Sequence, residues 1–467
     1  MKVTIQNLGV IQKAEIDLRP LTIFIGPNNA GKTWLAYALA GILGPYGYGE
    51  YVRAYSTKDV PERYTLIDIA IQQLIDEGSA KIDLVQFAEE HGEAYFNNVA
   101  LLAKGWMRRF MGTEKVSFED LAIHLSLAET KEHLRKRVLN FSLEDNRAVG
   151  RGKRKPLLTA LKEPGKRDLY IYTSSSVEEV SERLPLRAIT EFLINNVFRV
   201  LHRSLYSDTY TFPAERADLI PFSTTTKVER QTTTTGELAQ REQRARLTPW
   251  YMLSFTAMIL KLFDSNVSER KEEANSDEAV RAYIELARRL GQQILGGDVD
   301  FSTPEPDPRR EIIFQTTAGV ILDVPVVSSM VKELSLLVLY LRYLAKPGDL
   351  LVIDEPEMNM HPEVQAQIIE FLAMLVNAGL NILITSHSTY VVDHLTNLMK
   401  AAENEKPEAI SSKFYLKRTD AFISKDKVSV YFVDQGTTTN VLDENGTIHW
   451  ETFSKVSDRV EQIYFEV

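Results

Sequence analysis

Short buried strands alternate with longer helices in the hydrophobic pattern of the chain. Apolar runs at residues 21–25, 349–353 and 381–385 have the length of strands in the interior of a sheet. The first run precedes a stretch of small and apolar residues, 34–43, that is typical of a helix packed on such a sheet. Polar residues follow these runs at the edge where open α/β folds bind ligands. The pattern therefore predicts an α/β fold with functional loops at the carboxyl ends of its strands.

The long middle of the chain has a different, mainly helical pattern. Residues 250–263 are apolar almost all round, which suits a buried core helix or, alternatively, a contact with another subunit. No heptad repeat is sustained, so a long coiled coil is not expected. Amphipathic helices are expected near residues 65–74, 84–110, 177–205 and 278–295. We interpret these helices as a compact lobe, inserted in two pieces around a strand at residues 209–212.

We expect nested domains, in which one domain, called the head because of the family resemblance given below, is assembled from both ends of the chain and encloses the helical insertion. The expected segments are 1–44 (head, N-terminal part), 45–207 (insertion, first part), 208–220 (return strand of the head), 221–296 (insertion, second part) and 297–467 (head, C-terminal part). Further strands are expected at 298–302, 311–316, 320–324, 413–417 and 428–434, with a hairpin turn at Asn445-Gly446.

Composition narrows the functional classes. The chain has 54 basic and 64 acidic residues, and its formal net charge of −10 argues against a surface that coats nucleic acid or acidic membrane as a whole. It contains no cysteine, which excludes disulfides, zinc-thiolate sites and a cysteine nucleophile. Its longest apolar stretch, residues 250–263, is too short to span a bilayer, and its first residues lack the apolar core of a signal peptide. We therefore expect a cytoplasmic protein without membrane contact.

A phosphate-binding loop follows the first strand. Residues 26–33, GPNNAGKT, match the Walker A pattern G-x-x-x-x-G-K-[ST] without a mismatch. Glycines let backbone N–H groups turn toward a phosphate, and the following helix N-terminus adds partial positive charge. Lys32 would reach the β- and γ-phosphates and Thr33 would hold Mg²⁺, whereas the alternative is a chance glycine turn before a helix. The predicted nucleotide-binding residues of this loop are Gly26, Pro27, Asn28, Asn29, Ala30, Gly31, Lys32, Thr33 and Trp34.

Two acids end the second buried strand. Asp354 and Glu355 open the sequence DEPE, which has the form of a Walker B motif. Asp354 is placed to hold Mg²⁺ and Glu355 to polarise the attacking water, unless both are merely exposed strand-end acids. His387 follows the third strand and could sense the γ-phosphate, although such a histidine alone would more often be structural. The predicted catalytic residues are Glu355, His387 and Lys32, and the predicted metal ligands are Thr33 and Asp354.

A serine pair opens an apolar helix that runs to about Leu344. By themselves, Ser328 is a good N-cap and Lys332 belongs to a solvated first turn. Together, however, GPNNAGKT, SSMVKEL, LLVIDEPEMNMHP and TSHS resemble the motifs of the ABC-type ATPase superfamily, in its branch with the SMC and double-strand-break repair proteins. The likeness is greatest to the OLD-like (overcoming lysogenization defect) ATPases. It implies ATP and Mg²⁺ as cofactors and a P-loop ATPase head with a mixed sheet flanked by helices.

The resemblance also implies a mechanism. Two heads of this superfamily dimerise head to tail and sandwich each nucleotide between the Walker motifs of one chain and the signature helix of the other. Ser328 and Ser329 would then contact the γ-phosphate in trans, with Lys332 as a counter-charge, so that ATP joins the heads and hydrolysis releases them. The chain departs from the pattern where it has Ser-Ser in place of Ser-Gly-Gly and where no Q-loop is clear. Glu215 and Arg216 follow a strand at a position similar to that of a Q-loop, and they are candidates for a supporting role only.

One segment of the predicted lobe is strongly basic. Residues 147–167 contain eight basic side chains and a single acid, Glu163. Such a cluster could neutralise phosphates of DNA or RNA, or an acidic partner surface, while the alternative is a solvated, glycine-broken loop. The predicted DNA contacts are Arg147, Arg151, Lys153, Arg154 and Lys155.

Two functions fit these sequence features. OLD nucleases, by resemblance, carry a C-terminal Toprim domain with an Asp-x-Asp pair, and none occurs after His387, so we expect no nuclease in this chain. The first hypothesis is an ATP-hydrolysing sensor or scaffold subunit that controls a separate effector, a Toprim nuclease or another toxin, in bacterial anti-phage defence. The second is a DNA-maintenance ATPase of the SMC type that clamps DNA. Transport ranks last, because a transporter ATPase rarely needs so large an insertion.

Overall fold

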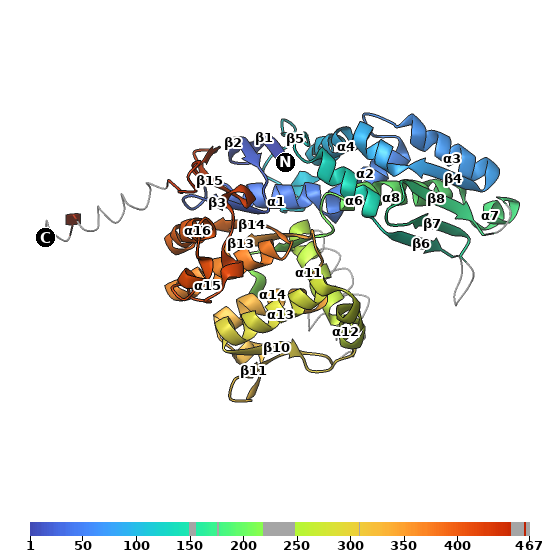
Figure 1. Cartoon of the computed structure of the whole chain (residues 1–467). Coiled ribbons are helices and arrows are strands. Elements are labelled where there is room, and N and C mark those ends of the chain that lie inside the picture. The colour runs from blue at the N-terminus through green and yellow to red at the C-terminus, as the bar shows by residue number, and fades with distance from the viewer. Residues whose placement is uncertain (149–155, 175–176, 218–247, 308, 450–461, 464–467) are drawn as a thin grey trace, which may run out of the picture. The chain divides into compact units, whose positions relative to one another are not determined.

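The computed structural model describes residues 1–148, 156–174, 177–217, 248–307, 309–449 and 462–463 (Figure 1). They form two compact units, each assembled from separated segments of the chain. Unit 1 consists of residues 1–7, 41–107 and 118–208, and unit 2 of residues 8–40, 108–117 and 209–467.

A mixed sheet forms the centre of unit 2, with its strands in the order β2-β16-β15-β3-β14-β13-β9. The four pairings from β15 to β9 are parallel, whereas β15 and β16 pair antiparallel. Phe24 lies opposite Thr385, and Asp354 lies opposite Thr385 on the other side, so the three predicted strands end at one edge. The strands are β2 (Ile11–Asp17), β3 (Leu21–Ile25), β9 (Thr209–Phe212), β13 (Leu350–Asp354), β14 (Asn381–Ser386), β15 (Val428–Asp434) and β16 (Thr437–Asn440).

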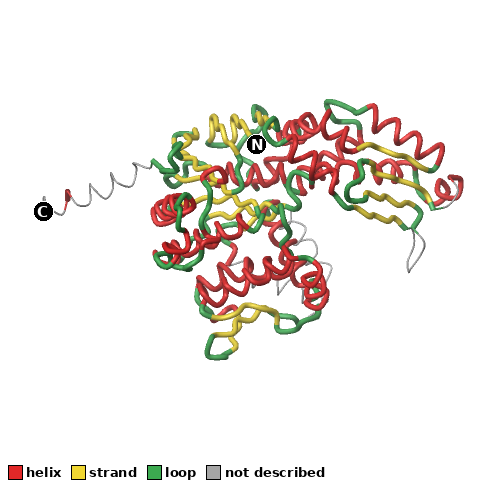
Figure 2. The backbone as a smooth tube through the Cα atoms, viewed as in Figure 1, coloured by secondary structure: helices red, strands yellow, loops and turns green. Residues whose placement is uncertain are grey.

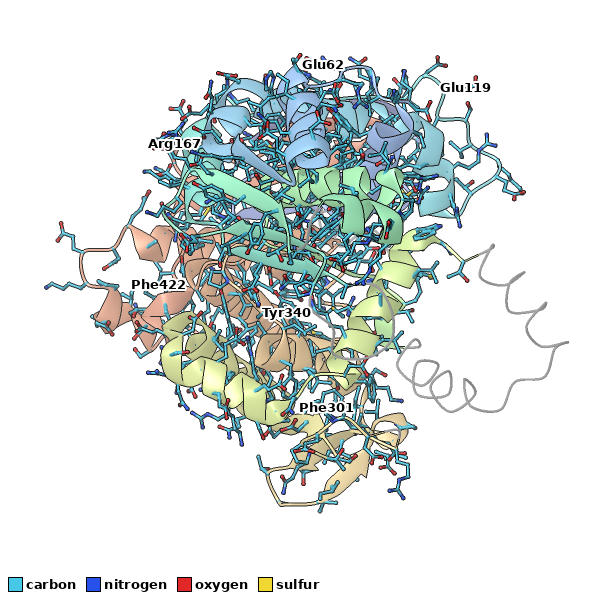
Figure 3. The ribbon with its side chains drawn as sticks, turned by 90° about the vertical axis from the view of Figure 1, so that its right-hand side faces the viewer. Glu62, Glu119, Arg167, Phe301, Tyr340 and Phe422 are labelled. Carbon is cyan, nitrogen blue, oxygen red and sulfur yellow. The ribbon has the colours of Figure 1, made fainter. Side chains whose placement is uncertain are left out.

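Helices cover this sheet and share one hydrophobic core with it. Alternate strand residues such as Ile23, Ile353 and Ile384 are buried in the same cluster as the apolar faces of α11 and α13–α16. Tyr340 of α14, labelled in Figure 3, is fully buried in that cluster. The helices are α1 (Lys32–Leu43), α11 (Trp250–Phe263), α12 (Val267–Ser276), α13 (Glu278–Arg289), α14 (Ser329–Tyr343), α15 (Pro362–Asn377), α16 (Thr389–Ala402) and α17 (Pro407–Ser411). The predicted α/β class, a mixed sheet flanked by helices, is confirmed.

The helices between residues 250 and 296 belong to unit 2, and the grouping of the chain thus differs here from the boundaries predicted for the insertion. The physical reason is their packing. Phe255 of α11 lies against Phe212 of β9 with ring centroids 5.8 Å apart, and the Tyr283 hydroxyl of α13 donates to the carbonyl of Ala378. The interpretation of residues 250–263 as a core helix is confirmed, because Phe255, Ile259 and Leu262 are fully buried.

Two segments beyond α13 test the strand predictions. A small antiparallel sheet confirms three of them, with β10 (Gly297–Phe301), β11 (Ile312–Thr316) and β12 (Ile321–Asp323) in that order. The strand predicted at residues 413–417 is wrong. There the Glu370 carboxylate accepts the backbone N–H groups of Tyr415 and Leu416, at 3.0 and 2.7 Å, so these groups are satisfied without a neighbouring strand. The turn at Gly446 is present, with φ at 75°.

Unit 1 contains a sheet that the sequence interpretation missed. Four antiparallel strands lie in the order β4-β8-β7-β6, with helices packed beside them (Figure 2). Strands β1 and β5 pair with each other, also antiparallel. The strands are β1 (Lys2–Leu8), β4 (Ser79–Asp83), β5 (Ala122–Ser126), β6 (Leu143–Arg147), β7 (Leu158–Lys162) and β8 (Asp168–Thr173). The insertion is thus mainly helical, as predicted, but is built around a small sheet.

Aromatic side chains fill the core between the helices of unit 1. The ring of Phe198 stacks on Tyr95 with centroids 5.1 Å apart, and Tyr51 meets both rings edge-on. The helix predicted near residues 177–205 is interrupted before Pro185, which occupies the N-cap position of the longer piece without a side-chain capping hydrogen bond. The helices are α2 (Pro45–Thr57), α3 (Thr65–Glu77), α4 (Leu84–Leu101), α5 (Ala103–Met111), α6 (Lys131–Asn140), α7 (Val177–Arg183) and α8 (Leu186–Arg203).

Candidate active site

The loop between β3 and α1 has the geometry of a phosphate-binding loop, and two of its glycines are required by that geometry. Gly26 has φ at 146°, and a Cβ there would lie 2.2 Å from the backbone oxygen of Val433 on β15. Gly31 has φ at 104°, and its Cβ would lie 2.5 Å from Ile11. A residue with a side chain would clash at both positions, so the motif is explained by the packing of the loop itself.

Lys32 is buried in this loop. Its exposed fraction is 4%, and its ammonium group donates to the carbonyls of Gly26 and Pro27, at 3.1 and 2.9 Å. Burial lowers the pKa of Lys32 to about 8, although the nearby carboxylates of Glu355 and Asp354 act in the opposite direction. The amine is therefore held at the loop by groups that a phosphate oxygen could replace.

Asp354 brings the two Walker motifs together. The carboxylate lies at the end of β13, is 4% exposed, and accepts a hydrogen bond from the hydroxyl of Thr33, with oxygen–oxygen distances of 3.1 and 3.2 Å. The buried hydroxyl of Tyr37 donates to the same carboxylate at 3.0 Å, and Thr385 adds a third hydroxyl. Burial raises the pKa of Asp354, while these hydroxyl donors act against that rise. The two predicted metal ligands thus lie in direct contact.

A hydrogen bond joins Glu355 and His387 beside Lys32. The carboxylate of Glu355 lies 3.1 Å from His387 Nε2, and the other ring nitrogen of His387 lies 3.5 Å from the Lys32 ammonium. Since the ammonium can only donate, Nδ1 accepts and the Nε2–H group donates to Glu355. This hydrogen bond lowers the pKa of Glu355, against the effect of its partial burial. The three predicted catalytic residues therefore form one continuous chain.

The backbone at Glu355 is in a rare conformation. Its φ is 47°, in the left-handed region that residues with a side chain seldom adopt. Its N–H group donates to the hydroxyl of Thr385 at 3.1 Å, which fixes the peptide on one side. The carboxylate of Glu355 lines a pocket of about 700 Å³, together with Lys32, Thr33 and His387. Val10, Asn28, Asn29, Gly31 and Trp34 complete its lining.

Glu357, the third acid of the DEPE run, also belongs to the site, although it was not predicted as a site residue. It is 6% exposed and accepts hydrogen bonds from the Ser386 hydroxyl, at 2.6 Å, and from the backbone N–H of His387, at 3.0 Å. Its second oxygen is buried with no hydrogen-bond partner among the described residues, and burial raises the pKa of Glu357. The position of this acid two residues beyond Glu355 was the available signal. It fixes the backbone that carries His387.

Arg216, predicted only as a candidate for a supporting role, contacts the backbone of the site. It is 2% exposed and donates to the backbone carbonyls of Asp354 and Glu355, at 2.7 and 3.1 Å. Glu215, the neighbouring candidate, is exposed to solvent. Of the two supporting candidates, only Arg216 contacts the strand end that bears the predicted metal ligand.

The three predicted signature residues lie at the start of α14. Ser328 and Ser329 are exposed at the start of α14, and the Ser328 hydroxyl caps the helix by accepting from the Val331 N–H group at 3.4 Å. The Lys332 ammonium donates to the carbonyl of Pro325 at 2.9 Å. Across the described ranges, the side chains of these three predicted residues make no hydrogen bond to Lys32, Thr33, Asp354 or Glu355. Ser328 and Ser329 are thus exposed to solvent, whereas Lys332 is half-buried.

Comparison with known families decides which kind of fold carries this site. A family model described as "AAA domain, putative AbiEii toxin, Type IV TA system" matches residues 112–393, more than half of the chain. The chain belongs to this family. A second model, described as an AAA ATPase domain, matches residues 1–144 of this AAA-domain protein. The predicted fold class, a P-loop ATPase head with a large insertion, is thereby confirmed.

Solved structures and curated proteins add less. No curated protein matches the AAA-domain chain significantly. The Smc head domain with an extended coiled coil, bound to the C-terminal domain of ScpA and derived from Pyrococcus furiosus, is 11% identical over 99% of this chain and 98% of that chain, with a TM-score of 0.34. The SMC head domain from Thermotoga maritima is 11% identical over 94% of this chain and 97% of that chain, with a TM-score of 0.31. Because these scores are low, the fold assignment rests on the family matches and the strand order.

The basic segment of the AAA-domain protein offers fewer free cations than its composition suggests. Lys162 is buried and donates to the carbonyls of Leu139 and Glu163, and the Arg167 guanidinium lies 2.8 Å from the Asp83 carboxylate. Arg147 donates to the carbonyl of Ala188. The predicted DNA contacts Arg151, Lys153, Arg154 and Lys155 lie outside the described residues. DNA binding by this segment therefore stays a prediction.

Within the described residues, no helix is long and apolar enough to cross a membrane.

Proposed function

We propose that this AAA-domain protein binds ATP with Mg²⁺ in the pocket at the end of β3, β13 and β14, and hydrolyses it. The observation that carries the proposal is a buried lysine, Lys32, near a buried aspartate, Asp354, at the edge where the parallel strands β3, β14 and β13 end. A lysine on a glycine loop suits phosphate oxygens, and an aspartate beside a hydroxyl suits a divalent cation. The family match to AAA ATPase domains supports the same activity.

Thr33 and Asp354 fit Mg²⁺, which prefers hard oxygen ligands. Their oxygens already lie 3.1 Å apart, and the burial that raises the pKa of Asp354 would be offset by a neighbouring cation. When bound, Mg²⁺ would neutralise charge on the β- and γ-phosphates. Lys32 would exchange its two loop carbonyls for phosphate oxygens, which are stronger acceptors.

Glu355 would orient and polarise the attacking water. Its carboxylate is about one-third exposed and lines the pocket, and its lowered pKa keeps it ionised and able to accept a hydrogen bond from water. His387, hydrogen-bonded to Glu355 and adjacent to Lys32, would link the position of that carboxylate to the state of the phosphate loop.

ATP binding by calorimetry and phosphate release will test this proposal. We expect Lys32→Met to weaken ATP binding by about 10- to 100-fold, because a charge-assisted contact is lost. Asp354→Asn should abolish Mg²⁺-dependent hydrolysis, because a carboxylate ligand of the cation is lost. The matched control is Lys162→Met, which removes another buried lysine that donates to backbone carbonyls. Equal ATP affinity of the wild type and Lys32→Met would contradict the proposed site.

We further propose that two heads pair head to tail, with Ser328, Ser329 and Lys332 completing the nucleotide site of the partner. The exposure of both serines supports this arrangement. The test is a mixing experiment with two inactive variants, Lys32→Met and Ser329→Arg. A head-to-tail dimer of one variant with the other contains one intact composite site, so mixing should restore hydrolysis. Absence of any recovery, with both variants folded and mixed dimers formed, would exclude sites shared between chains.

The biological role that we propose is that of an OLD-like sensor or scaffold ATPase that controls a separate effector in anti-phage defence. The family description, which refers to an AbiEii toxin and a type IV toxin–antitoxin system, supports a two-component arrangement. Plaque counts on cells that carry the chain with its neighbouring reading frames will test the role. Protection should depend on Glu355 and on at least one neighbouring frame. Full protection by Glu355→Gln would separate the defence role from ATP hydrolysis.

A further inference from the structure

Arg216 lies where two parallel strands end side by side. Phe212, the last residue of β9, is in register with Ile353 of β13, so the turn after β9 runs beside Asp354 and Glu355. From this turn, Arg216 Nη1 donates to the Asp354 carbonyl at 2.7 Å, and Nη2 donates to the Glu355 carbonyl at 3.1 Å. The planar guanidinium thus holds the two carbonyls that flank the α-carbon of Glu355.

The same side chain also holds the signature helix. Arg216 Nε lies 2.9 Å from the Glu333 carboxylate and 3.2 Å from the Glu333 carbonyl. Both side chains are 2% exposed, and Glu333 is close to the start of α14, the helix that Ser328 caps. One buried ion pair therefore joins the Walker B strand end to the helix that presents the two exposed serines.

The contacted strand end needs support. Glu355 has φ at 47°, a conformation that a residue with a side chain keeps only when its surroundings hold it. Thr385 holds the N–H group of Glu355, and Arg216 holds the carbonyls on either side of its α-carbon. Loss of the guanidinium would release the backbone that aims the Glu355 carboxylate into the pocket.

We propose that Arg216 is a positioning residue that aims Glu355 and couples the nucleotide site to the first turn of α14. The inference rests on the proposed ATP hydrolysis, in which Glu355 polarises water. A shift of the Walker B strand end on ATP binding is transmitted through the guanidinium to Glu333, and so to the residues that a second head would contact. No direct contact of Arg216 with nucleotide is required.

A merely structural ion pair would have a different signature, and the chain offers a matched control for it. Arg270 is 5% exposed and holds the opposite end of α14, donating to the carbonyls of Arg342 and Ala345 at 3.2 and 2.7 Å. It also pairs with a carboxylate, that of Glu273. Both arginines stabilise one helix, but only Arg216 reaches Glu355.

The experiment compares the full-length wild type with Arg216→Lys, with the double variant Arg216→Met/Glu333→Leu, and with Arg270→Met. Lysine keeps the charge opposite Glu333 but cannot hold two carbonyls in a fixed fork. The double variant removes both charges and so leaves no buried charge unpaired. If the double variant does not fold, Arg216→Lys carries the test. Melting temperature, ATP affinity, kcat and KM are measured for each protein.

We expect both Arg216 variants to lose about 100-fold in kcat, the effect of displacing a catalytic group by about 1 Å, while ATP affinity changes less than about threefold. Arg270→Met should have a lower melting temperature than the wild type, without this loss in kcat. Hydrogen exchange adds a second readout. ATP should change exchange of the amides in residues 329–334 of the wild type, and this response should be absent in Arg216→Lys.

Three outcomes would overturn the inference. One is a folded Arg216 variant with a kcat within about threefold of the wild type, since a misplaced Glu355 costs far more. Another is an Arg270→Met protein that loses as much kcat as Arg216→Lys. The third is an exchange response to ATP that persists in Arg216→Lys, which would refute the coupling. A wild type that does not hydrolyse ATP would instead refute the proposed function, and the inference with it.

Discussion

Two carboxylate–histidine pairs in unit 2 have the same chemistry and opposite surroundings. In the first, Glu355 lies 3.1 Å from His387, and the side chains are 33% and 29% exposed. In the second, Glu370 lies 2.7 Å from His394, and the side chains are 0% and 14% exposed. The pair alone therefore does not distinguish an active site from a structural contact.

The difference lies in what else each carboxylate binds. Both oxygens of Glu370 accept backbone N–H groups, from Tyr415 and Leu416, so its hydrogen-bonding capacity is used by the fold. The Glu355 carboxylate has its hydrogen bond from His387 and otherwise faces the pocket. A carboxylate with unused acceptors beside a cavity can bind water or ligand, whereas a saturated one anchors a loop.

The largest expected effect is on catalysis at the Glu355–His387 pair, which faces the pocket. Glu355→Gln should lower the kcat for ATP hydrolysis by about 100- to 10,000-fold, because the amide cannot act as a base. ATP affinity and melting temperature should change little, since the side chain keeps its size and its contact with His387. Phosphate release and thermal unfolding check both parts. A large fall in melting temperature would mean that this pair, too, serves the fold.

The corresponding variant of the buried Glu370–His394 pair tests its structural role. Glu370→Gln places an amide N–H group against backbone donors and should lower the free energy of unfolding by about 1–3 kcal/mol. The kcat of the folded protein should stay that of the wild type. Urea unfolding and phosphate release, measured on the same preparation, give the two numbers. An unchanged free energy of unfolding would show that the hydrogen bonds of Glu370 to Tyr415 and Leu416 do not stabilise the fold.

The smallest expected effect is a pH dependence of ATP affinity, caused by Lys32 beside the Glu355–His387 pair. Burial lowers the pKa of Lys32 from 10.5 to about 8, so the ammonium loses its charge above that pH while the unfolded chain still holds the proton. ATP affinity should therefore fall about fivefold from pH 8 to pH 9, and the contribution of Lys32 to stability should rise between about pH 8 and 10.5. The matched variant, Lys32→Arg, stays charged and should have a flat affinity profile.

Much of this site is readable from the sequence because it depends on strand ends and spacing. A glycine loop after β3 and an acid after β13 lie at the same sheet edge because both strands run parallel to β14, which lies between them, and Thr33 and Asp354 are in contact there. The contributions of Arg216 and Glu357 were less visible, because each acts through backbone groups that only the folded chain brings near. Spacing in the sequence does not predict which distant backbone groups a buried side chain will hydrogen-bond.

The errors have equally physical causes. The strand expected at residues 413–417 fails because a distant glutamate, Glu370, takes its N–H groups. The hairpin of β7 and β8 was missed although Pro164-Gly165 marks its turn and Leu169 and Ile171 alternate with exposed residues along β8. The charge of residues 147–167 predicts exposed cations, whereas Lys162, one of these cations, is buried.

The close approach of Gly26 to Val433 has a consequence for the order in which the protein matures. The phosphate loop is encoded at the start of the chain, but it packs against β15, near the other end, and β15 is hydrogen-bonded along the whole length of β3. A ribosome that has passed His387 has already translated every motif of the nucleotide site, yet the loop has no neighbour on that side. The support that β15 gives to β3 and to the phosphate loop can therefore form only after residues 428–434 have been translated.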